Sequence, residues 1–438
     1  MKSALSSVVY VGLYLLLALL PLHVAMVADP ITLDRPWRLE FAVGCGFIAF
    51  SLIWLEFALV SRLRTLSDSF GTDTLVQFHR SMGISASVLL LTHVLLLLPA
   101  SGWQALLPWR GSWLTQSGAL AFWALVVLTV SSLWRRRLRV SFDLWNRLHR
   151  VAALVAAVAG TLHLWAVAGY SARTSVRLAT LLIVALCGGI LIWYAVVRPL
   201  HLWRRPWRVS ANRALGADTR LLTVRPDGHP GYAYHPGQFA WLISGRTPFS
   251  RAQHPITIAS APAADGSQSF AIKALGDWSG QVVPQLQPGA RLWVEGPYGA
   301  LTVDRLPAQG FVLIAGGIGI TPMLAIVQTL AERRDPRPCL LFYAANDRSR
   351  VVFAEELAAL QQRMALTLVY VFEHPRPGDG GESGRITPEL MRRYLPAELP
   401  WFQCLICGPN PMMDSVEQSL RALGVAADRI HSERFDQV

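Results

Sequence analysis

The sequence predicts a membrane α-helical bundle of six spans, followed by an antiparallel β-barrel and a doubly wound α/β domain. Three observations support this fold class. Long runs of Leu, Val, Ala and Trp fill the first 200 residues, whereas short runs with turn signals follow Pro206 and are typical of antiparallel strands. From Gly310 onward, strand-like and helix-like segments alternate, as in a parallel sheet covered by helices. We therefore expect domains at residues 1–204, 205–305 and 306–438.

Six apolar stretches are each long enough to cross a hydrocarbon core of about 30 Å as a helix. They run from Val8 to Ala28, Glu40 to Val60, Gln77 to Leu98, Ser117 to Trp134, His149 to Ala168 and Arg177 to Val197. The alternative for the first stretch is a signal peptide. Its apolar run is longer than a usual signal core, and no clean small-residue cleavage site follows it, so we expect a span.

The chain carries a formal net charge of +12, and its arginines gather where the apolar runs end. The alternative cause of such a charge, a nucleic-acid partner, lacks any accompanying binding motif. Cytoplasmic loops of membrane proteins are enriched in Lys and Arg. The loops after the second, fourth and sixth spans hold Arg62, Arg64, Arg135, Arg136, Arg137, Arg139, Arg147, Arg198, Arg204, Arg205 and Arg208. We therefore predict a multi-pass protein of the cell inner (plasma) membrane, with the N-terminus and everything after Arg198 in the cytoplasm.

Four histidines lie within the predicted spans and form two pairs with equal spacing. His79 and His93 belong to the third span, His149 and His163 belong to the fifth, and each pair is fourteen residues apart. Fourteen helical residues rise about 21 Å and return to nearly the same face. Both spans are expected to run from inside to outside. His79 should therefore meet His149 near the inner surface, and His93 should meet His163 near the outer one.

Two such levels of facing imidazoles fit two b-type haems, each with a pair of histidines as iron ligands. Ionisable side chains at membrane depth are costly and tend to be functional. Bis-histidine ligation suits electron transfer, because no coordination position has to open. The alternative interpretation is four unrelated interior histidines bonded to backbone or water.

Beyond the barrel, a strand ending at Ala315 runs into a glycine-rich turn and then a helix. The expected elements are strand 311–315, helix 322–334, strand 338–344, helix 353–364, strand 366–372 and strand 402–407. The turn holds Gly316, Gly317, Gly319, Thr321 and Pro322. Glycines let the backbone approach a pyrophosphate, whose charge the helix N-terminus favours. We expect Thr321 to cap this helix, Pro322 to lie in its first turn, and the turn to bind a nucleotide.

Further segments carry a family resemblance. The barrel region contains His254-Pro255-Ile256-Thr257 followed by Ser260, then Lys273 and Gly276-Asp277-Trp278-Ser279-Gly280. Later come Glu295-Gly296-Pro297-Tyr298-Gly299, Cys407-Gly408-Pro409-Asn410-Pro411-Met412 and Ser432-Glu433-Arg434-Phe435. In this order the segments resemble the ferredoxin-reductase-type flavoprotein module. The whole chain resembles bacterial relatives of the NADPH oxidase and ferric reductase family.

The resemblance implies a role for each segment. The residues expected to bind the flavin of FAD are His254, Pro255, Ile256, Thr257 and Ser260, and those expected to hold its pyrophosphate are Lys273, Ser279 and Gly280. Cys407, Gly408 and Pro409 are expected at the nicotinamide. Phe435 is expected to cover the flavin face until nicotinamide displaces it, although this chain continues three residues past that aromatic. Thr257, Cys407 and Phe435 are thus the candidate catalytic contacts.

Two smaller signals concern cysteine and arginine. Cys404 and Cys407 form a Cys-x-x-Cys pair, for which a redox or metal site is the alternative interpretation, but no further ligands accompany the pair. We expect Cys404 in the strand core. Arg348 and Arg350 follow the second strand of the α/β domain, where the resemblance puts ribose selectivity, and they favour the 2′-phosphate of NADPH over NADH.

Together these expectations describe a transmembrane NAD(P)H oxidase or ferric reductase. Electrons would pass from NADPH or NADH through FAD and two haems to dioxygen, giving superoxide, or to ferric iron at the outer face. One alternative is delivery of electrons to a protein partner outside the membrane, which the fused reductase module argues against. A second is a non-enzymatic haem-binding scaffold or sensor, which the intact motifs argue against.

Overall fold

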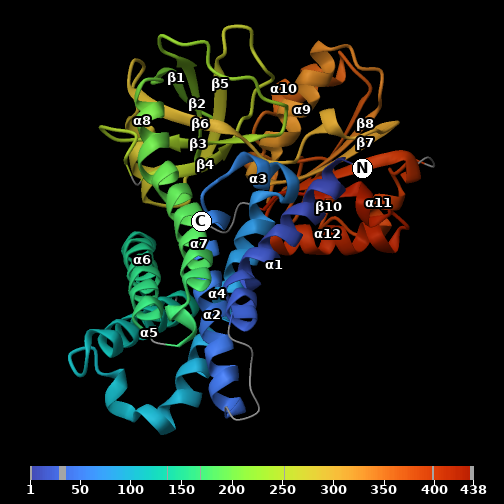
Figure 1. Cartoon of the computed structure of the whole chain (residues 1–438). Helices are drawn as coiled ribbons and strands as arrows, with labels where there is room; N and C mark the ends of the chain where they lie inside the picture. The colour runs from blue at the N-terminus through green and yellow to red at the C-terminus, as the bar shows by residue number, and fades with distance from the viewer. Residues whose placement is uncertain are drawn as a thin grey trace. The chain divides into compact units, whose positions relative to one another are not determined.

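The computed structural model describes residues 2–28, 36–135, 137–167, 169–250, 252–396 and 399–434. The chain divides into two compact units, Met1–Val196 and Val197–Val438, whose elements are labelled in Figure 1. The first unit is helical, and the second contains both sheets.

Long apolar helices make up the first unit. Its helices are α1 (Lys2–Ala28), α2 (Trp37–Leu59), α3 (Arg64–Phe70), α4 (Thr72–Ser101), η1 (Trp103–Leu106), α5 (Trp113–Trp134), α6 (Phe142–Ala166), η2 (Tyr170–Ala172) and α7 (Thr174–Ile192). α7 continues through the π-helical turn η3 (Trp193–Val197) into α8 (Arg198–Trp203). Within the described part of the chain, six helices are long and apolar enough to cross a membrane: α1, α2, α4, α5, α6 and the α7–α8 run.

The six predicted spans are therefore confirmed, with ends that differ by a few residues. The largest difference is in α6, which begins at Phe142 rather than at His149. The physical reason is a side-chain cap: Ser141 Oγ accepts a hydrogen bond from the Leu144 amide at 3.4 Å, which satisfies one of the unpaired donors at a helix start.

Polar side chains join neighbouring helices inside this bundle. Helix α2 packs along α4, and α5 packs along α6. Trp54 Nε1 of α2 donates to Thr161 Oγ1 of α6 at 3.0 Å, and the hydroxyls of Ser87 in α4 and Thr129 in α5 lie 2.7 Å apart. Each bond satisfies polar groups that would be costly to leave unpaired in hydrocarbon.

The second unit starts with an antiparallel barrel, as predicted. Its strands are β1 (Trp207–Ala214), β2 (Thr219–Pro226), β3 (Phe239–Ile243), β4 (Gln253–Thr257), β5 (Gln268–Lys273) and β6 (Arg291–Tyr298), in the order β4-β3-β6-β1-β2-β5. Trp207, Leu222 and Phe270 fill its interior. A hydrogen bond from Ala259 N to Ser269 O at 2.7 Å links the two ends of this order.

A six-stranded parallel sheet follows, and the predicted doubly wound domain is confirmed. Its elements are β7 (Gly310–Gly316), η7 (Gly317–Gly319), α9 (Ile320–Glu332), β8 (Cys339–Ala345), α10 (Ala354–Gln361), β9 (Leu366–Phe372), β10 (Glu382–Ser383), α11 (Pro388–Arg392), β11 (Phe402–Cys407), α12 (Asn410–Ala422) and β12 (Ile430–Ser432). The strand order is β10-β9-β8-β7-β11-β12. Helices α9 and α10 pack on one face and α11 and α12 on the other (Figure 1). The order reverses between β7 and β11, where doubly wound sheets bind their ligands.

Candidate functional site

The glycine-rich turn after β7 meets the loop after β11 at this reversal point. Ala315 pairs with Cys407 across the two strands. A Cβ atom on Gly319 would collide with the Cys407 carbonyl oxygen, and one on Gly316 would lie 2.6 Å from Met412 Sδ. Glycine is therefore required for the two loops to approach. The structure thus brings together the predicted pyrophosphate turn and the predicted nicotinamide segment, which are far apart in sequence.

Helix α9 presents its N-terminus at the same place. It begins at Ile320, preceded by Gly319, which has no side chain to cap the helix. The expectation that Thr321 caps the helix is wrong: its hydroxyl donates to the Ile318 carbonyl at 3.0 Å, because the helix follows the 3-10 turn η7 directly and starts two residues earlier than expected. Pro322 lies in the first turn, as predicted. The first amides of α9 therefore remain suited to an anion.

The two cysteines of β11 lie on opposite faces of the sheet. Cys404 packs in the core beneath α11 and α12, and Cys407 packs in the core beneath α9 and α10. Burial raises the pKa of the Cys404 thiol to about 12, as expected for a strand-core residue. A shared metal or disulfide site for this pair is therefore excluded by geometry. Among the described residues, no group of three or more His, Cys, Asp or Glu side chains could hold a metal ion.

Strand β4 carries the predicted flavin segment. Thr257 pairs with Phe239 of β3 and is 7% exposed. The His254 ring stacks on Trp278, with centroids 4.0 Å apart and an interplanar angle of 16°. Trp278 Nε1 in turn donates to Ser244 Oγ at 2.7 Å. This stack joins β4 to the predicted pyrophosphate turn, a contact that the sequence motif did not reveal.

The remaining residues of the flavin segment are held by the barrel itself. Pro255 and Ile256 pair with β3, and Ser260 Oγ accepts from the Ser269 amide at 3.1 Å. Tyr234 donates to the Ala261 carbonyl at 2.8 Å, and burial raises its pKa to about 12. The loop after β4 is therefore fixed before any ligand binds.

Two residues that are expected to bind phosphate groups, Lys273 and Arg350, contact the carboxylate of Asp218. Lys273 Nζ lies 3.8 Å from Asp218 Oδ2, and Arg350 Nη1 lies 3.0 Å from the same oxygen. Ser279 Oγ accepts from the amides of Leu275 and Gly276 at 3.0 Å each, and Gly280 donates to the Gly276 carbonyl at 2.8 Å. Hydrogen bonds thus order the turn after β5. Lys273, at the end of β5, lies near Arg350 of the α/β domain, because both contact Asp218.

The loop after β8 contacts an arginine of another loop that sequence reasoning did not assign to this site. Arg348 lies over the Tyr370 ring at 4.4 Å. Arg376, from the loop after β9, pairs with buried Asp347 at 3.1 Å. Arg376 was missed because its position depends on the parallel pairing of β8 with β9, which brings the two loops to one edge.

The tail of the chain returns to the barrel. Glu433 is 4% exposed, and a Cβ on Gly299 would lie 2.7 Å from Glu433 Oε1 and 3.1 Å from Phe239. Arg434 pairs with Asp414 of α12 at 2.7 Å. Phe435 lies outside the described residues, so its stacking role stays a prediction.

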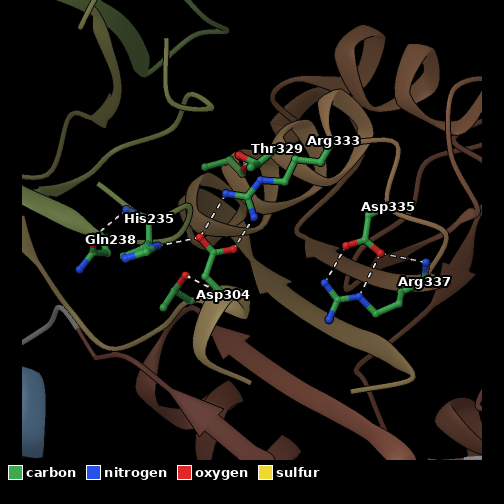
Figure 2. Close-up of polar contacts among 9 residues, drawn as sticks. His235, Gln238, Asp304, Thr329, Arg333, Asp335 and Arg337 are labelled. Atoms are coloured by element: carbon green, nitrogen blue, oxygen red, sulfur yellow. Dashed lines mark hydrogen bonds and ion pairs between the residues drawn. The ribbon is translucent and has the colours of Figure 1, made fainter. Parts of the chain in front are cut away.

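A second set of ion pairs connects the barrel to α9 (Figure 2). Asp304 Oδ2 lies 2.6 Å from His235 Nδ1, and both carboxylate oxygens bind Arg333, at 2.5 and 3.1 Å. Hydrogen bonding to Arg333 holds the pKa of Asp304 below its usual range. Gln238 donates to the Gly299 carbonyl at 3.1 Å. These contacts orient the turn that leads into β3.

In the helical unit, the four histidines meet in the expected pairs. The ring centroids of His79 and His149 are 6.2 Å apart, and those of His93 and His163 are 6.5 Å apart. Both separations leave room between the rings for one metal ion with two bonds of about 2 Å to nitrogen. Their role as iron ligands stays a prediction.

Each histidine also has a partner for Nδ1 on a neighbouring helix. His93 Nδ1 lies 2.7 Å from the Ala42 carbonyl, and His163 Nδ1 lies 3.0 Å from the Leu114 carbonyl. At the other level, His79 Nδ1 pairs with Glu56, and His149 Nδ1 lies 3.2 Å from Ser132 Oγ. Such partners orient metal-binding imidazoles and leave Nε2 for the metal. The surroundings therefore fit bis-histidine haems.

Two glycines make the contacts of the His93–His163 pair possible. A Cβ on Gly46 would lie 2.8 Å from His93 Nδ1, and one on Gly118 would lie 2.7 Å from His163 Nδ1. Each glycine follows the accepting carbonyl, at Ala42 or Leu114, by four residues. The helix pairs α2–α4 and α5–α6 thus share one arrangement, in which a histidine ring lies over a glycine of the neighbouring helix. Sequence reasoning missed these glycines, and the available signal was a glycine within each neighbouring apolar span.

The fold and these sites define a membrane oxidoreductase with a flavin-binding barrel and a nicotinamide-binding domain. Comparison with known proteins supports the same architecture. Residues 45–160 match the family described as ferric reductase like transmembrane component, residues 208–302 match an FAD-binding domain, and residues 313–418 match an oxidoreductase NAD-binding domain. The chain therefore has the ferric reductase and NADPH oxidase-like architecture that the motifs indicated.

Part of this chain is similar in sequence to several known proteins. Xylene/toluene monooxygenase electron transfer component XylA of Pseudomonas putida is 29% identical over 233 residues, which cover 52% of this chain and 64% of that protein. The ferredoxin reductase component of 3-ketosteroid-9-alpha-monooxygenase of Rhodococcus rhodochrous is 30% identical over 236 residues, again 52% and 64%. This chain thus spans less than two thirds of the length of these relatives.

One solved structure resembles most of the chain. The flavohemoglobin of Malassezia yamatoensis, described with bound FAD and heme, aligns with a TM-score of 0.51 and 18% identity, covering 92% of this chain and 99% of that one. This likeness shows the fold alone.

Proposed function

We propose that the chain carries electrons from cytoplasmic NADPH, through FAD and two b-type haems, across the bilayer to an acceptor at the outer face. Dioxygen, giving superoxide, is the favoured acceptor and ferric iron the second. The proposed domains are the di-haem bundle 1–204, the FAD barrel 205–305 and the nucleotide domain 306–438. The observation that carries the proposal is the two facing histidine pairs, each ring held through Nδ1, in a chain that also has a complete reductase module.

The residues of the reductase module would perform binding and orientation. Gly316, Gly317 and Gly319 let the nucleotide pyrophosphate approach the α9 N-terminus, whose partial positive charge favours it. The Cys407–Pro409 loop lies against this turn, which supports a nicotinamide site there. Arg348 and Arg350, which follow β8, favour a 2′-phosphate and hence NADPH over NADH.

The barrel would hold FAD and the helical unit would hold haem. Thr257 offers a buried hydroxyl on β4, and Lys273 and Ser279 lie at the turn that would hold the FAD pyrophosphate. FAD, when bound, supplies the conversion of a hydride into single electrons, and each haem supplies a one-electron carrier without an open coordination position. His79 with His149, and His93 with His163, would be the ligands.

Orientation follows from charge. The arginine-rich loops of the chain, including the segment after Arg198, belong on the cytoplasmic side of the plasma membrane, which is where NADPH is available. The outer pair is then His93 with His163, and the acceptor would react at that level.

The first experiment follows the absorption bands of the purified protein loaded with haem and FAD. NADPH is added without oxygen, and air is then admitted. We expect reduction of the haems, followed by rapid reoxidation and superoxide. Reduced haem that is stable in air would point to ferric iron or a protein partner as acceptor, and absence of any haem reduction would contradict the electron path.

A further inference from the structure

The two histidine pairs have different surroundings. At the level of His93 and His163, both Nδ1 atoms face main-chain carbonyls. At the level of His79 and His149, both Nδ1 atoms face side chains, the carboxylate of Glu56 and the hydroxyl of Ser132. Among the described residues, only the second level therefore has a carboxyl group, which can carry a full negative charge, in contact with a ring.

Glu56 lies in α2, an apolar helix long enough to cross the membrane, and its side chain is 13% exposed. A carboxylate in such a place costs free energy unless it is paired. The carboxylate pairs with the imidazole of His79. A bound ferric haem would bring a further compensating positive charge. Position and charge together direct this carboxylate toward the inner haem site.

Resting on the proposed function, we infer that Glu56 is a positioning residue for the inner haem, which it tunes to a lower midpoint potential than the outer haem. By accepting the Nδ1 hydrogen of His79, the carboxylate fixes the ring and raises its basicity as a ligand. The negative charge also stabilises the ferric haem, whose net positive charge is lost on reduction. Carbonyls at the outer level carry only partial charge, so transfer from inner to outer haem is downhill.

The test is a spectroelectrochemical titration of the full-length holoprotein. Glu56→Gln keeps a hydrogen-bond acceptor but removes the charge. We expect it to raise the lower of the two midpoint potentials by at least about 59 mV, which corresponds to a tenfold change in a one-electron equilibrium constant. The higher midpoint potential should stay unchanged. Glu56→Asp keeps the charge and should keep two haems with the lower potential near that of the wild type.

Glu40→Gln is the matched control. Glu40 lies in the same helix, but its carboxylate accepts from the Tyr170 hydroxyl, and neither midpoint should move. Two haems whose potentials do not change in Glu56→Gln would overturn the inference and leave the proposed function standing. Loss of the inner haem from both Glu56→Gln and Glu56→Asp would also overturn it, since the role would then be structural. A wild-type protein that binds no bis-histidine haem would refute the proposed function itself.

Discussion

At Gly118 and Gly46, the absence of a side chain lets a histidine ring reach a main-chain carbonyl of the neighbouring helix. The ring then has one nitrogen fixed and the other directed to its partner histidine. The same principle operates at Gly319, where the absence of a Cβ lets two loops of the α/β domain touch. Single residues thus set distances at both candidate cofactor sites, because close-packed interiors accommodate an added methyl group only by moving.

Gly118→Ala is expected to reduce binding of the outer haem. The added Cβ would lie 2.7 Å from His163 Nδ1, so the ring must move and the contact with the Leu114 carbonyl must lengthen, at a cost of about 1–3 kcal/mol. Haem content per purified chain should fall by about half, measured by pyridine haemochrome absorbance. Gly189→Ala in α7 is the control, since its Cβ would meet nothing within 4 Å. Full haem content in Gly118→Ala would contradict the assignment of His163 as ligand.

Asp304→Asn should weaken the connection between the barrel and α9. The free energy of unfolding of the second unit, Val197–Val438, is expected to fall by about 1 kcal/mol at pH 7, the usual scale for partly exposed ion pairs. Because the pKa of Asp304 is lowered in the folded state, its contribution is present above the ordinary carboxyl pKa of about 4 and is lost as pH falls below it. Urea unfolding followed by tryptophan fluorescence measures the difference at each pH.

The Asp304 comparison has an internal control. Asp335→Asn removes a carboxylate that accepts hydrogen bonds from Arg337, two residues away (Figure 2), and should have the smaller effect. An Asp304→Asn variant whose destabilisation persists unchanged at low pH would show that the charge is not responsible.

At the scale of elements, the turn between β7 and α9 forms the centre of the candidate nucleotide site. A strand end, a 3-10 turn and a helix N-terminus follow one another without a side-chain cap. The neighbouring loop after β11 is pressed against this turn by the parallel pairing of the two strands. The amides at the start of α9 are therefore held in place for a pyrophosphate before it binds.

Gly319→Ala is expected to weaken NADPH binding at least tenfold, about 1.4 kcal/mol. The new methyl group collides with the Cys407 carbonyl, which is backbone and cannot rotate away, so the two loops must separate. Stopped-flow reduction of bound FAD at varied NADPH concentration gives the apparent affinity. FAD content should stay at the wild-type level, because this turn lies in the α/β domain, and unchanged affinity would argue against the assigned pyrophosphate site.

At the scale of the whole molecule, the distribution of charge predicts the topology. The chain has 40 Lys and Arg against 28 Asp and Glu, and the arginines cluster after the second, fourth and sixth apolar helices. Because the reductase module begins after the sixth helix, the proposed topology puts it in the cytoplasm.

The orientation predicts which membrane vesicles are active. Inside-out vesicles should oxidise added NADPH, whereas sealed right-side-out vesicles should do so only after detergent is added. The loss of NADPH absorbance measures the activity of each preparation. The latency of a known cytoplasmic enzyme verifies that the vesicles are sealed. Equal activity in sealed vesicles of both kinds would contradict the proposed topology.

The sequence by itself determined the elements and their class. Hydropathy located all six apolar helices, and alternating patterns located β9 and β11 with the bounds that the structure has. The fourteen-residue spacing placed His79, His93, His149 and His163 in facing pairs. These features follow from local periodicity, because a helix or a strand repeats its faces at fixed intervals along the chain.

Only the tertiary structure decided what surrounds those elements. The carbonyl partners of His93 and His163 are 51 and 49 residues away in sequence, and Arg350 meets Asp218 across 132 residues. The roles of Gly46, Gly118 and Glu56 depend on which helix packs beside which, and the start of α9 depends on the turn that precedes it. Local patterns carry no information about such contacts, because they arise when distant segments pack at a distance set by the side chains between them.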